Sequence, residues 1–346
     1  MNTSSLAEKK TTYENIIQIK DGYDLPVYGI TEGTFYTLHV PAMACICISF
    51  ICAMSVILYS FYRQNYSKFF DWSKSERFVV YMSLCDALFN VSHFSDHLHI
   101  VVTKSFPTPK GLCAFYGFML AEFITAQNLM VNIVAINVFV LIYFRKQMFF
   151  GRWDYRLLVY IFGVPAIGCI TAGALDQFGP NGAFCTFDAI KGKTTYIFFT
   201  TVPLLLILAI NIGLYTLSWG RIYRETREIK DSLGKSSRAL QASHKAAKTM
   251  SLFVTAFFIQ WWALAVFGVC QLSGNVPPLL LNLVTTFSNI GGLLNGIVFI
   301  FIVKRKREKA SDNGSHKSGS VGTGSTPIQS ISHSTRASPA IQNSEV

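Results

Sequence analysis

The sequence is short of charged residues. Asp, Glu, Lys and Arg make up 14% of its 346 residues, against about 25% in a typical soluble domain. Long stretches contain neither Lys nor Arg, and a bilayer accommodates such apolar surface where water does not. The scarcity of charge therefore excludes soluble, fibrous, disulfide-framework and wholly disordered proteins. The net charge of +11 has a membrane explanation and gives no reason to expect nucleic acid as a partner.

Several chemical signatures are also missing. The last apolar run contains no Lys before Lys304, so it offers no amine for a retinal Schiff base. No Gly-rich phosphate loop, nucleophile elbow or Cys-x-x-Cys pair occurs. No Cys follows Cys270, which excludes palmitoylation of the C-terminal tail. The chain is expected to be neither an enzyme nor a protein with a cofactor.

The sequence does contain apolar runs long enough to cross a membrane, which takes about 20 residues of helix. The third run has 33 residues, about 50 Å as a helix, so it should tilt or extend into the cytoplasm. We predict an all-α membrane protein, a seven-transmembrane helix bundle. The seven predicted spans are residues 37–61, 78–100, 112–144, 156–175, 194–219, 249–271 and 278–303.

Basic residues outside these spans lie mostly on one side. Of the 30 Lys and Arg residues, 23 fall in the segments on the side of the C-terminus and 7 on the other. The excess predicts an N-terminus outside the cell and a C-terminus in the cytoplasm, in a multi-pass protein of the plasma membrane. The predicted parts are an extracellular tail over 1–36, a seven-transmembrane domain over 37–307, and a disordered, Ser/Gly-rich cytoplasmic tail over 308–346.

Two of the eight Cys residues differ from the rest. The other six lie in or near spans and should pack as small apolar residues. Cys113 opens the third span from outside, and Cys185 lies in the second outer loop. Both face the oxidising side, so we predict a disulfide that holds the loop over the bundle; two free thiols are the alternative. The sequon at Asn2 lies on the same side and is a predicted glycosylation site.

Ionisable residues inside the spans are costly and often functional. In the second span Asp86, His93 and His97 are spaced by seven and four residues, which places them on one helix face. His93, His97 and Glu122 of the third span are predicted to line a ligand cavity that opens outward. The alternative is a set of hydrogen bonds that only holds the helices together.

A deeper polar layer is predicted to rearrange on activation. It combines the Asp86 carboxylate with asparagines of the third and seventh spans; a static network is the alternative. Trp261 and Trp262 are adjacent in the sixth span, so only one is expected to face inward. The asparagines of this layer are Asn132, Asn289 and Asn295.

A metal site is a rival interpretation of the histidines. His93 and His97, four residues apart, present two imidazoles on one face, as zinc ligands often do. A catalytic zinc needs a third ligand and an open position, and Glu122 is the one candidate in another span. No metal is therefore predicted.

Short motifs in three spans differ from the signatures of rhodopsin-like receptors. Residues 141–146 read LIYFRK, without acid-Arg-Tyr; residues 260–262 read QWW, without the usual Pro; and residues 289–296 read NIGGLLNG, not Asn-Pro-x-x-Tyr. Seven spans, an outer N-terminus, a cysteine pair and a basic third inner loop nevertheless resemble the G-protein-coupled receptor superfamily. The rhodopsin-like class is expected to fit poorly.

Three short motifs carry a narrower resemblance. Residues 83–88 read SLCDAL, residues 163–165 read GVP, and residues 289–295 form a Gly-rich, Asn-containing stretch. In these motifs the sequence is most similar to the slime-mould cyclic-AMP-receptor-like family and its orphan animal relatives. Cyclic AMP itself is a poor candidate ligand, because phosphate recognition favours fixed cations and no span contains Lys or Arg.

The resemblance implies a receptor that connects an unknown extracellular ligand to a heterotrimeric G protein. Basic residues at the cytoplasmic ends are expected to rim the coupling cleft; anchoring of the spans is the alternative. Phosphorylation by receptor kinases and arrestin binding are expected at the Ser/Thr-rich tail, with an inert linker as the alternative. Residues 304–307 should bind anionic membrane lipids. The predicted coupling residues are Arg145, Arg221, Arg224, Arg227, Lys245 and Lys248.

Two other functions remain open from the sequence. A seven-helix transporter or channel is disfavoured, because no repeat relates the two halves of the chain. A membrane-embedded zinc hydrolase would use the histidines discussed above.

Overall fold

The computed structural model describes residues 19–232, 238–273 and 276–318. In this part of the chain seven helical runs follow the seven predicted spans. The first three are the continuous helices α2 (Phe35–Arg63), α3 (Lys74–Thr103) and α4 (Lys110–Phe144). The sixth is α9 (Arg238–Ser273), which begins well before the predicted residue 249. Residues up to Val303 form one compact unit, and a second unit begins at Lys304.

The fourth and fifth runs each contain a π-helical turn. The fourth consists of α5 (Tyr155–Leu158), the π-turn η4 (Val159–Gly163) and α6 (Val164–Ala174). The fifth consists of α7 (Lys193–Tyr196), the π-turn η5 (Ile197–Thr201) and α8 (Val202–Ser232). Pro165 and Pro203 stand just after these turns. Proline lacks an N–H and clashes with the preceding turn, so a local π adjustment is the expected response inside a bundle.

The seventh run is broken in the membrane. It consists of α10 (Pro278–Ser288) and α11 (Gly291–Ser318), whose axes meet at 41°. The break falls at Asn289 and Ile290, which separate the two helices. The break places backbone groups at the centre of the bundle, where other spans approach them closely.

Five helices of the described residues are long and apolar enough to cross a membrane, and six if the bent pair counts as one span. α3 falls short of this composition although it is helical over the whole predicted span. Its acids and histidines lower its hydropathy, and all of them except His99 are buried within the bundle. An interior position lets a polar span cross a bilayer.

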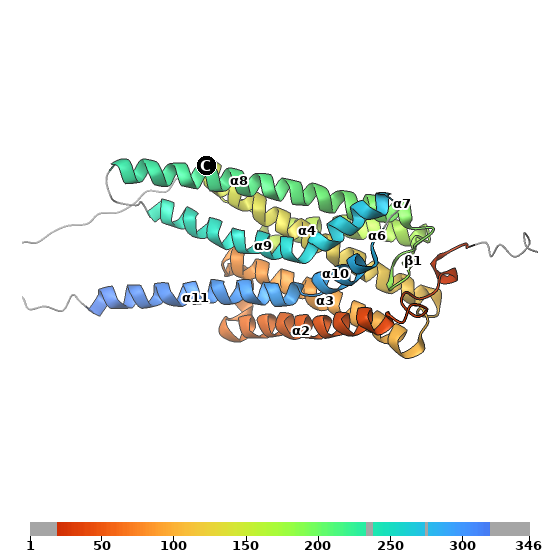
Figure 1. The fold of residues 1–346 in the computed structure, drawn as a ribbon. Coiled ribbons are helices and arrows are strands. Elements are labelled where there is room, and N and C mark those ends of the chain that lie inside the picture. The colour runs from red at the N-terminus through yellow and green to blue at the C-terminus, as the bar shows by residue number, and fades with distance from the viewer. Residues whose placement is uncertain (1–18, 233–237, 274–275, 319–346) are drawn as a thin grey trace, which may run out of the picture. The chain divides into compact units, whose positions relative to one another are not determined.

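One end of the bundle bears a small hairpin. Strands β1 (Phe178–Pro180) and β2 (Cys185–Phe187) pair antiparallel, with Pro180 opposite Cys185. The predicted disulfide between Cys113 and Cys185 is confirmed and ties the hairpin to the first turn of α4. We call this the outer end, and the opposite one the inner end, following the predicted orientation. The hairpin and residues 19–34 lie at the same end of the helices (Figure 1).

Residues 19–34, here called the strap, pack onto the hairpin. The strap contains the 3₁₀ turn η1 (Gly22–Asp24), whose Gly22 N–H donates to Asp188 Oδ2 at 2.8 Å. The Tyr28 N–H donates to the Gly182 carbonyl at 2.7 Å. A Cβ at Gly22 would lie 2.1 Å from the Pro180 carbonyl oxygen, so only glycine allows this approach.

The inner end is organised by two 3₁₀ turns, η2 (Tyr66–Asp71) and η3 (Arg152–Asp154). Between these ends the main apolar core runs through α2, α3, α4, α8, α9, α10 and α11. Buried polar side chains gather beneath the hairpin and at the break in the last span, and a buried ion pair lies at the inner end.

Candidate functional site

A narrow cavity of about 40 Å³ lies beneath the hairpin. Its walls come from α3, α4, β2, η5, α9 and α10. Such a volume holds a few water molecules and no organic ligand. Phe184 of the hairpin closes it from outside, with its ring centroid 5.0 Å from that of His93. The residues central to its lining are Phe89, His93, Phe184, Tyr196, Trp261 and Ser288.

Trp261 faces this cavity and is fully buried, whereas the neighbouring Trp262 is 38% exposed and packs on Phe287. The prediction that only one of the two rings faces inward is confirmed.

Three buried histidines form a continuous hydrogen-bonded chain beside the cavity. His39 Nδ1 of α2 lies 2.7 Å from His97 Nδ1, and His97 Nε2 lies 3.1 Å from His93 Nε2. His93 Nδ1 then contacts Asn289 Oδ1 at 2.8 Å, at the break in the last span. The sequence placed His93 and His97 on one face, but it did not reveal His39 as their third member.

The three predicted ligand residues do not share one cavity. His93 lines it, whereas His97 lies behind His93, between it and His39. Glu122 is buried away from the cavity and faces Cys169 of α6, and its Oε2 has no hydrogen-bond partner among the described residues. Periodicity had placed Glu122 on an inward face, and the fourth span rather than the second occupies that side of α4.

A second polar cluster, the amide–carboxylate cluster, surrounds the break in the last span. Asp86 accepts hydrogen bonds from Asn295 Nδ2 at 2.6 Å and Gln127 Nε2 at 3.1 Å. Gln260 Nε2 donates to Gln127 Oε1 and to the Ser288 carbonyl, both at 3.2 Å. Because Ser288 lines the cavity, the cluster connects the cavity floor to four different spans.

Glycine makes this convergence possible. A Cβ at Gly291 would lie 2.4 Å from both Asp86 Oδ1 and Gln260 Nε2. A Cβ at Gly292 would lie 2.2 Å from the Ser49 carbonyl oxygen, and the Gly292 N–H donates to Ser49 Oγ at 2.8 Å. The break therefore brings backbone directly against side chains of α2, α3 and α9.

The structure brings together only part of the predicted deep layer. Asn295 contacts Asp86, as expected, but Asn132 donates to Asn211 of α8 at 3.1 Å, and Asn289 belongs to the histidine chain. Gln127 takes the place of Asn132 and Asn289 as a partner of Asp86. The sequence pattern missed Gln127 because this residue lies off the helix face that Glu122 and Asn132 define. Its one signal was the presence of an uncharged amide in mid-span.

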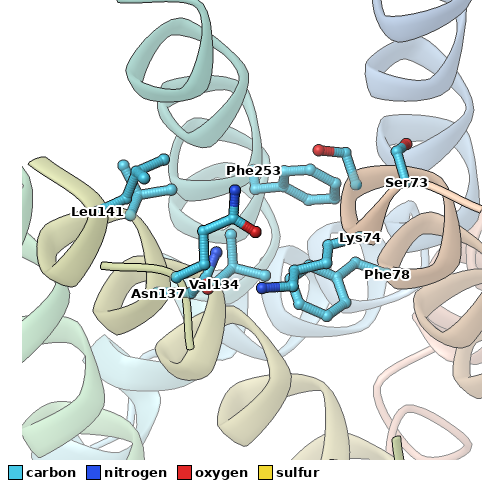
Figure 2. Close-up of a pocket in the computed structure, with 10 residues that line it drawn as sticks. Ser73, Lys74, Phe78, Val134, Asn137, Leu141 and Phe253 are labelled. Atoms are coloured by element: carbon cyan, nitrogen blue, oxygen red, sulfur yellow. The ribbon is translucent and has the colours of Figure 1, made fainter. Parts of the chain in front are cut away.

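A larger crevice of about 310 Å³ opens at the inner end. Figure 2 shows Val134, Asn137 and Leu141 of α4 facing Phe253 of α9 across it, with Lys74 and Phe78 of α3 on a third side. Lys74 Nζ donates to the Met148 carbonyl at 2.5 Å and so ties α3 to the loop after α4. The exposed surface of the crevice is more apolar than polar, although five of its lining residues are polar: Ser73, Lys74, Ser75, Asn137 and Gln147.

Some of the predicted coupling cations are already paired. Glu225 binds Arg145 at 2.6 Å and Arg221 at 2.9 Å, which joins the ends of α4 and α8. Arg224 and Arg227 are exposed on α8, which extends to Ser232 and thus beyond the predicted span. Lys245 and Lys248 lie in α9, but their side chains fall outside the described residues, as does Asn2 altogether.

A buried ion pair holds the loop beside the crevice. Arg77 Nε lies 2.7 Å from Asp154 Oδ2, and Tyr81 Oη donates to the same oxygen at 3.0 Å. Arg77 also donates to the carbonyls of Phe70 and Trp72. Asp154 has a left-handed backbone with φ of 56°, an energetically costly conformation that the ion pair helps to hold.

No group of three or more His, Cys, Asp or Glu side chains suited to a metal ion occurs among the residues that the structure describes. The imidazoles of His39, His97 and His93 are instead hydrogen-bonded to one another and to Asn289.

The comparisons with known proteins agree with this architecture. The family model of the seven-transmembrane receptors of the rhodopsin family matches residues 65–299, and the chain belongs to that family. The crystal structure of squid rhodopsin matches with a TM-score of 0.59 at 17% identity, over 78% of this chain and 81% of that one. No curated protein matches.

Family membership corrects one prediction. The rhodopsin-like class was expected to fit poorly because three short signatures are absent, and that expectation is wrong. The signatures occupy few positions, whereas the family match extends over most of the bundle. The same membership assigns the chain to receptors rather than enzymes, so the zinc-hydrolase alternative is not supported.

Proposed function

We propose that this protein is a plasma-membrane receptor, with its N-terminus outside, that couples an extracellular ligand to a heterotrimeric G protein. The observation that carries the proposal is the inner crevice of about 310 Å³ between α3, α4 and α9. A mostly apolar groove of this kind accepts the apolar face of a partner helix, with cations around it to set orientation.

The amide–carboxylate cluster links the outer cavity to α3, α4 and α9, the helices that also line the inner crevice. The cavity floor at Ser288 contacts Gln260, and Gln260 continues through Gln127 to Asp86. A ligand that prefers one arrangement of this cluster would shift the inner crevice as well. By linkage, a G protein that prefers the same arrangement must raise ligand affinity in return.

Finer parts of the proposal rest on the sequence. The exposed Arg224 and Arg227, together with Lys245 and Lys248, would contact the G protein, while Arg145 and Arg221 would first have to leave Glu225. Phosphorylation of the tail, arrestin binding, lipid binding at residues 304–307 and glycosylation of Asn2 belong to the same proposal. So does the narrower resemblance to the slime-mould cyclic-AMP-receptor-like family.

The proposal is tested by filling the crevice. Asn137→Trp places a large ring among the lining residues without adding a charge. In cells expressing G-protein dissociation sensors, the wild-type chain should activate at least one G protein above mock-transfected cells. The variant should lower this activation at least tenfold at equal surface expression.

Ile170→Trp is the matched control, because Ile170 is 62% exposed on α6 and faces away from the core. It should signal as the wild type does. Equal signalling by the crevice variant and the wild type would contradict the proposal, as would solute flux through a chain that activates no G protein.

A further inference from the structure

The histidine chain has a feature that static packing does not require. His39, His97 and His93 are all buried, and they join α2 to α3 and then to the break in the last span. We propose that this chain is a proton-binding relay, and that a hydrated proton from the outer medium is the ligand that operates the receptor. The inference rests on the proposed receptor function and names its ligand.

The direction of every hydrogen bond in the histidine chain follows from the bond between His93 and Asn289. Asn289 Nδ2 donates to the Thr285 carbonyl, which can only accept, so Asn289 Oδ1 faces His93. His93 Nδ1 must therefore carry a hydrogen. In a neutral imidazole the other nitrogen is then bare, so His93 Nε2 accepts.

The same reasoning passes outward along the chain. His97 Nε2 must donate to His93 Nε2, which leaves His97 Nδ1 bare and accepting from His39 Nδ1. His39 Nε2 is then a bare, basic nitrogen at the end of the chain. It is buried, and no hydrogen-bond partner for it occurs in the part of the chain that the structure describes. An orphaned buried acceptor is costly, and here it is the one place where the chain can receive a proton.

This nitrogen lies near the outer surface. His39 is four residues from Phe35, the first residue of α2, which is one helical turn or about 6 Å. The Phe35 ring lies against His39, with centroids 4.5 Å apart, and Lys104 Nζ lies 4.0 Å from the centre of the same ring. A small movement of Phe35 and Lys104 would open His39 Nε2 to water from outside.

The transfer balances without any other reactant. A proton adds to His39 Nε2, and the hydrogen on His39 Nδ1 moves to His97 Nδ1. The hydrogen on His97 Nε2 then moves to His93 Nε2. His39 and His97 end neutral in the opposite tautomer, and His93 ends as an imidazolium with one positive charge. The charge thus appears at the cavity wall and beside Asn289.

Among the described residues no acid is hydrogen-bonded to an imidazole of the chain. Asp96, three residues after His93, accepts from the Cys185 N–H through Oδ2, and its buried Oδ1 has no hydrogen-bond partner among those residues. Glu122 of α4 faces Cys169. Asp86 is bound by amides of α4 and α11, and α10 carries no titratable side chain. The other ionisable groups around the outer end are Tyr36 on α2, His99 and Lys104 on α3, Lys110 and Tyr116 on α4, Lys193 and Tyr196 on α7, Lys20, Asp21, Tyr23, Asp24, Tyr28 and Glu32 in the strap, and Asp176, Asp188 and Lys191 beside the hairpin.

An imidazolium buried without an acid partner is costly, so protonation disfavours the closed arrangement. Proton binding therefore favours a state in which the break at Asn289 moves and water or a carboxylate reaches His93. For one bound proton the population of that state rises by up to about tenfold per pH unit.

The experiment compares two Gln substitutions. His39→Gln keeps an N–H that can donate to His97 Nδ1 but has no basic nitrogen. His99→Gln changes a histidine on α3 outside the chain and serves as the control. G-protein activation in cells and hydrogen exchange of residues 284–294 in purified receptor in nanodiscs are each measured from pH 8 to pH 5.5.

In the wild type and His99→Gln, acid should raise G-protein activation and speed hydrogen exchange at the break by fivefold or more. In His39→Gln both acid responses should be lost, at surface expression within twofold of the wild type. An acid response that survives in His39→Gln overturns the relay.

The two proposals fail separately. G-protein activation that does not change with pH, with exchange at the break also unchanged, sinks the relay and leaves the receptor function standing. If no G protein is ever activated, the receptor function fails. Hydrogen exchange at the break that speeds up in acid, and that His39→Gln abolishes, would then still support proton binding by the relay. Hydrogen exchange that does not change with pH would contradict proton binding as well.

Discussion

The outer and inner ends of the bundle are held in different ways. The outer end is closed by several ties in parallel, namely the disulfide, the hairpin and the strap, and it encloses only about 40 Å³. The inner end leaves a crevice of about 310 Å³, and one buried ion pair, Arg77 with Asp154, fixes the loop beside it. The contrast suggests that the outer end is built to resist change, and that the inner end is open to a partner.

The largest expected effect on stability comes from removing the ion pair between Arg77 and Asp154 at the inner end. Arg77→Met leaves the Asp154 carboxylate buried. Among the described side chains, only Tyr81 Oη then still donates a hydrogen bond to it. Losing one member of a buried pair costs about 3–5 kcal/mol. The midpoint of thermal inactivation of the purified receptor should fall accordingly.

The double variant Arg77→Met/Asp154→Asn should regain much of this loss. It removes the uncompensated charge, and Asn tolerates the left-handed backbone at this position. A double variant as unstable as the single one would show that the charge is not the cause.

Removing the disulfide at the outer end should lower the free energy of unfolding somewhat less, because the strap and hairpin contacts remain. Cys113→Ala with Cys185→Ala opens a link across 72 residues, and a disulfide typically contributes about 2–4 kcal/mol. Hydrogen exchange should rise in β1, β2 and the strap and stay unchanged around the inner crevice. Cys47→Ala, at an exposed free thiol, should leave both regions unchanged.

The break between the two ends can be tested by adding one methyl group. Gly291→Ala forces Asp86 and Gln260 apart, since the new Cβ would lie 2.4 Å from each. Overpacking of this kind costs about 1–3 kcal/mol, measurable as a lower midpoint of thermal inactivation. Gly296→Ala, where the new Cβ meets its nearest atom at 3.7 Å, should be neutral or slightly stabilising.

The smallest effect is expected from the surface charges of the strap. A hydrogen bond from Lys110, at 2.5 Å, and the charges of Lys110 and Lys191 hold the pKa of Asp21 below its usual 3.8. A lowered pKa in the folded state means stabilisation that is present above pH 3.8 and is lost as the pH falls through the lowered value. Lys110 is exposed, so solvent screens the pair and the gain stays below about 1 kcal/mol.

Asp21→Asn should therefore lower thermal stability slightly at pH 7, and the difference from the wild type should shrink toward pH 3. Asp71→Asn, at an exposed residue of η2, should show no such pH dependence. A deficit of Asp21→Asn that grows in acid would contradict the assignment of the ion pair.

Much of the fold could be predicted because the bilayer imposes a simple rule on composition. A helix in lipid needs about 20 apolar residues, so the spans can be read from runs that lack Lys and Arg. The disulfide followed from the side of the membrane on which Cys113 and Cys185 were placed. The second span could be recognised despite its low hydropathy, since its polar residues share one face.

The polar clusters were only half predictable, because periodicity gives the face of one helix and not the neighbour that the face meets. It placed Asp86 and Asn295 in the interior, where they meet. It could not show that Asn132 meets Asn211, that Glu122 turns toward the fourth span, or that Gln127 binds Asp86. His39 was missed because a lone histidine near the start of a span carries no pattern.

By itself the sequence determined the number of spans, their approximate positions and the residues that must avoid lipid, since the free energy of placing each side chain in a bilayer is a local property. Only the tertiary structure decided which polar groups pair, because partners such as His39 and His97 lie on different helices and meet only when the helices pack. The break at Asn289 likewise depends on close approach by neighbouring spans, and that approach is set by packing across the bundle.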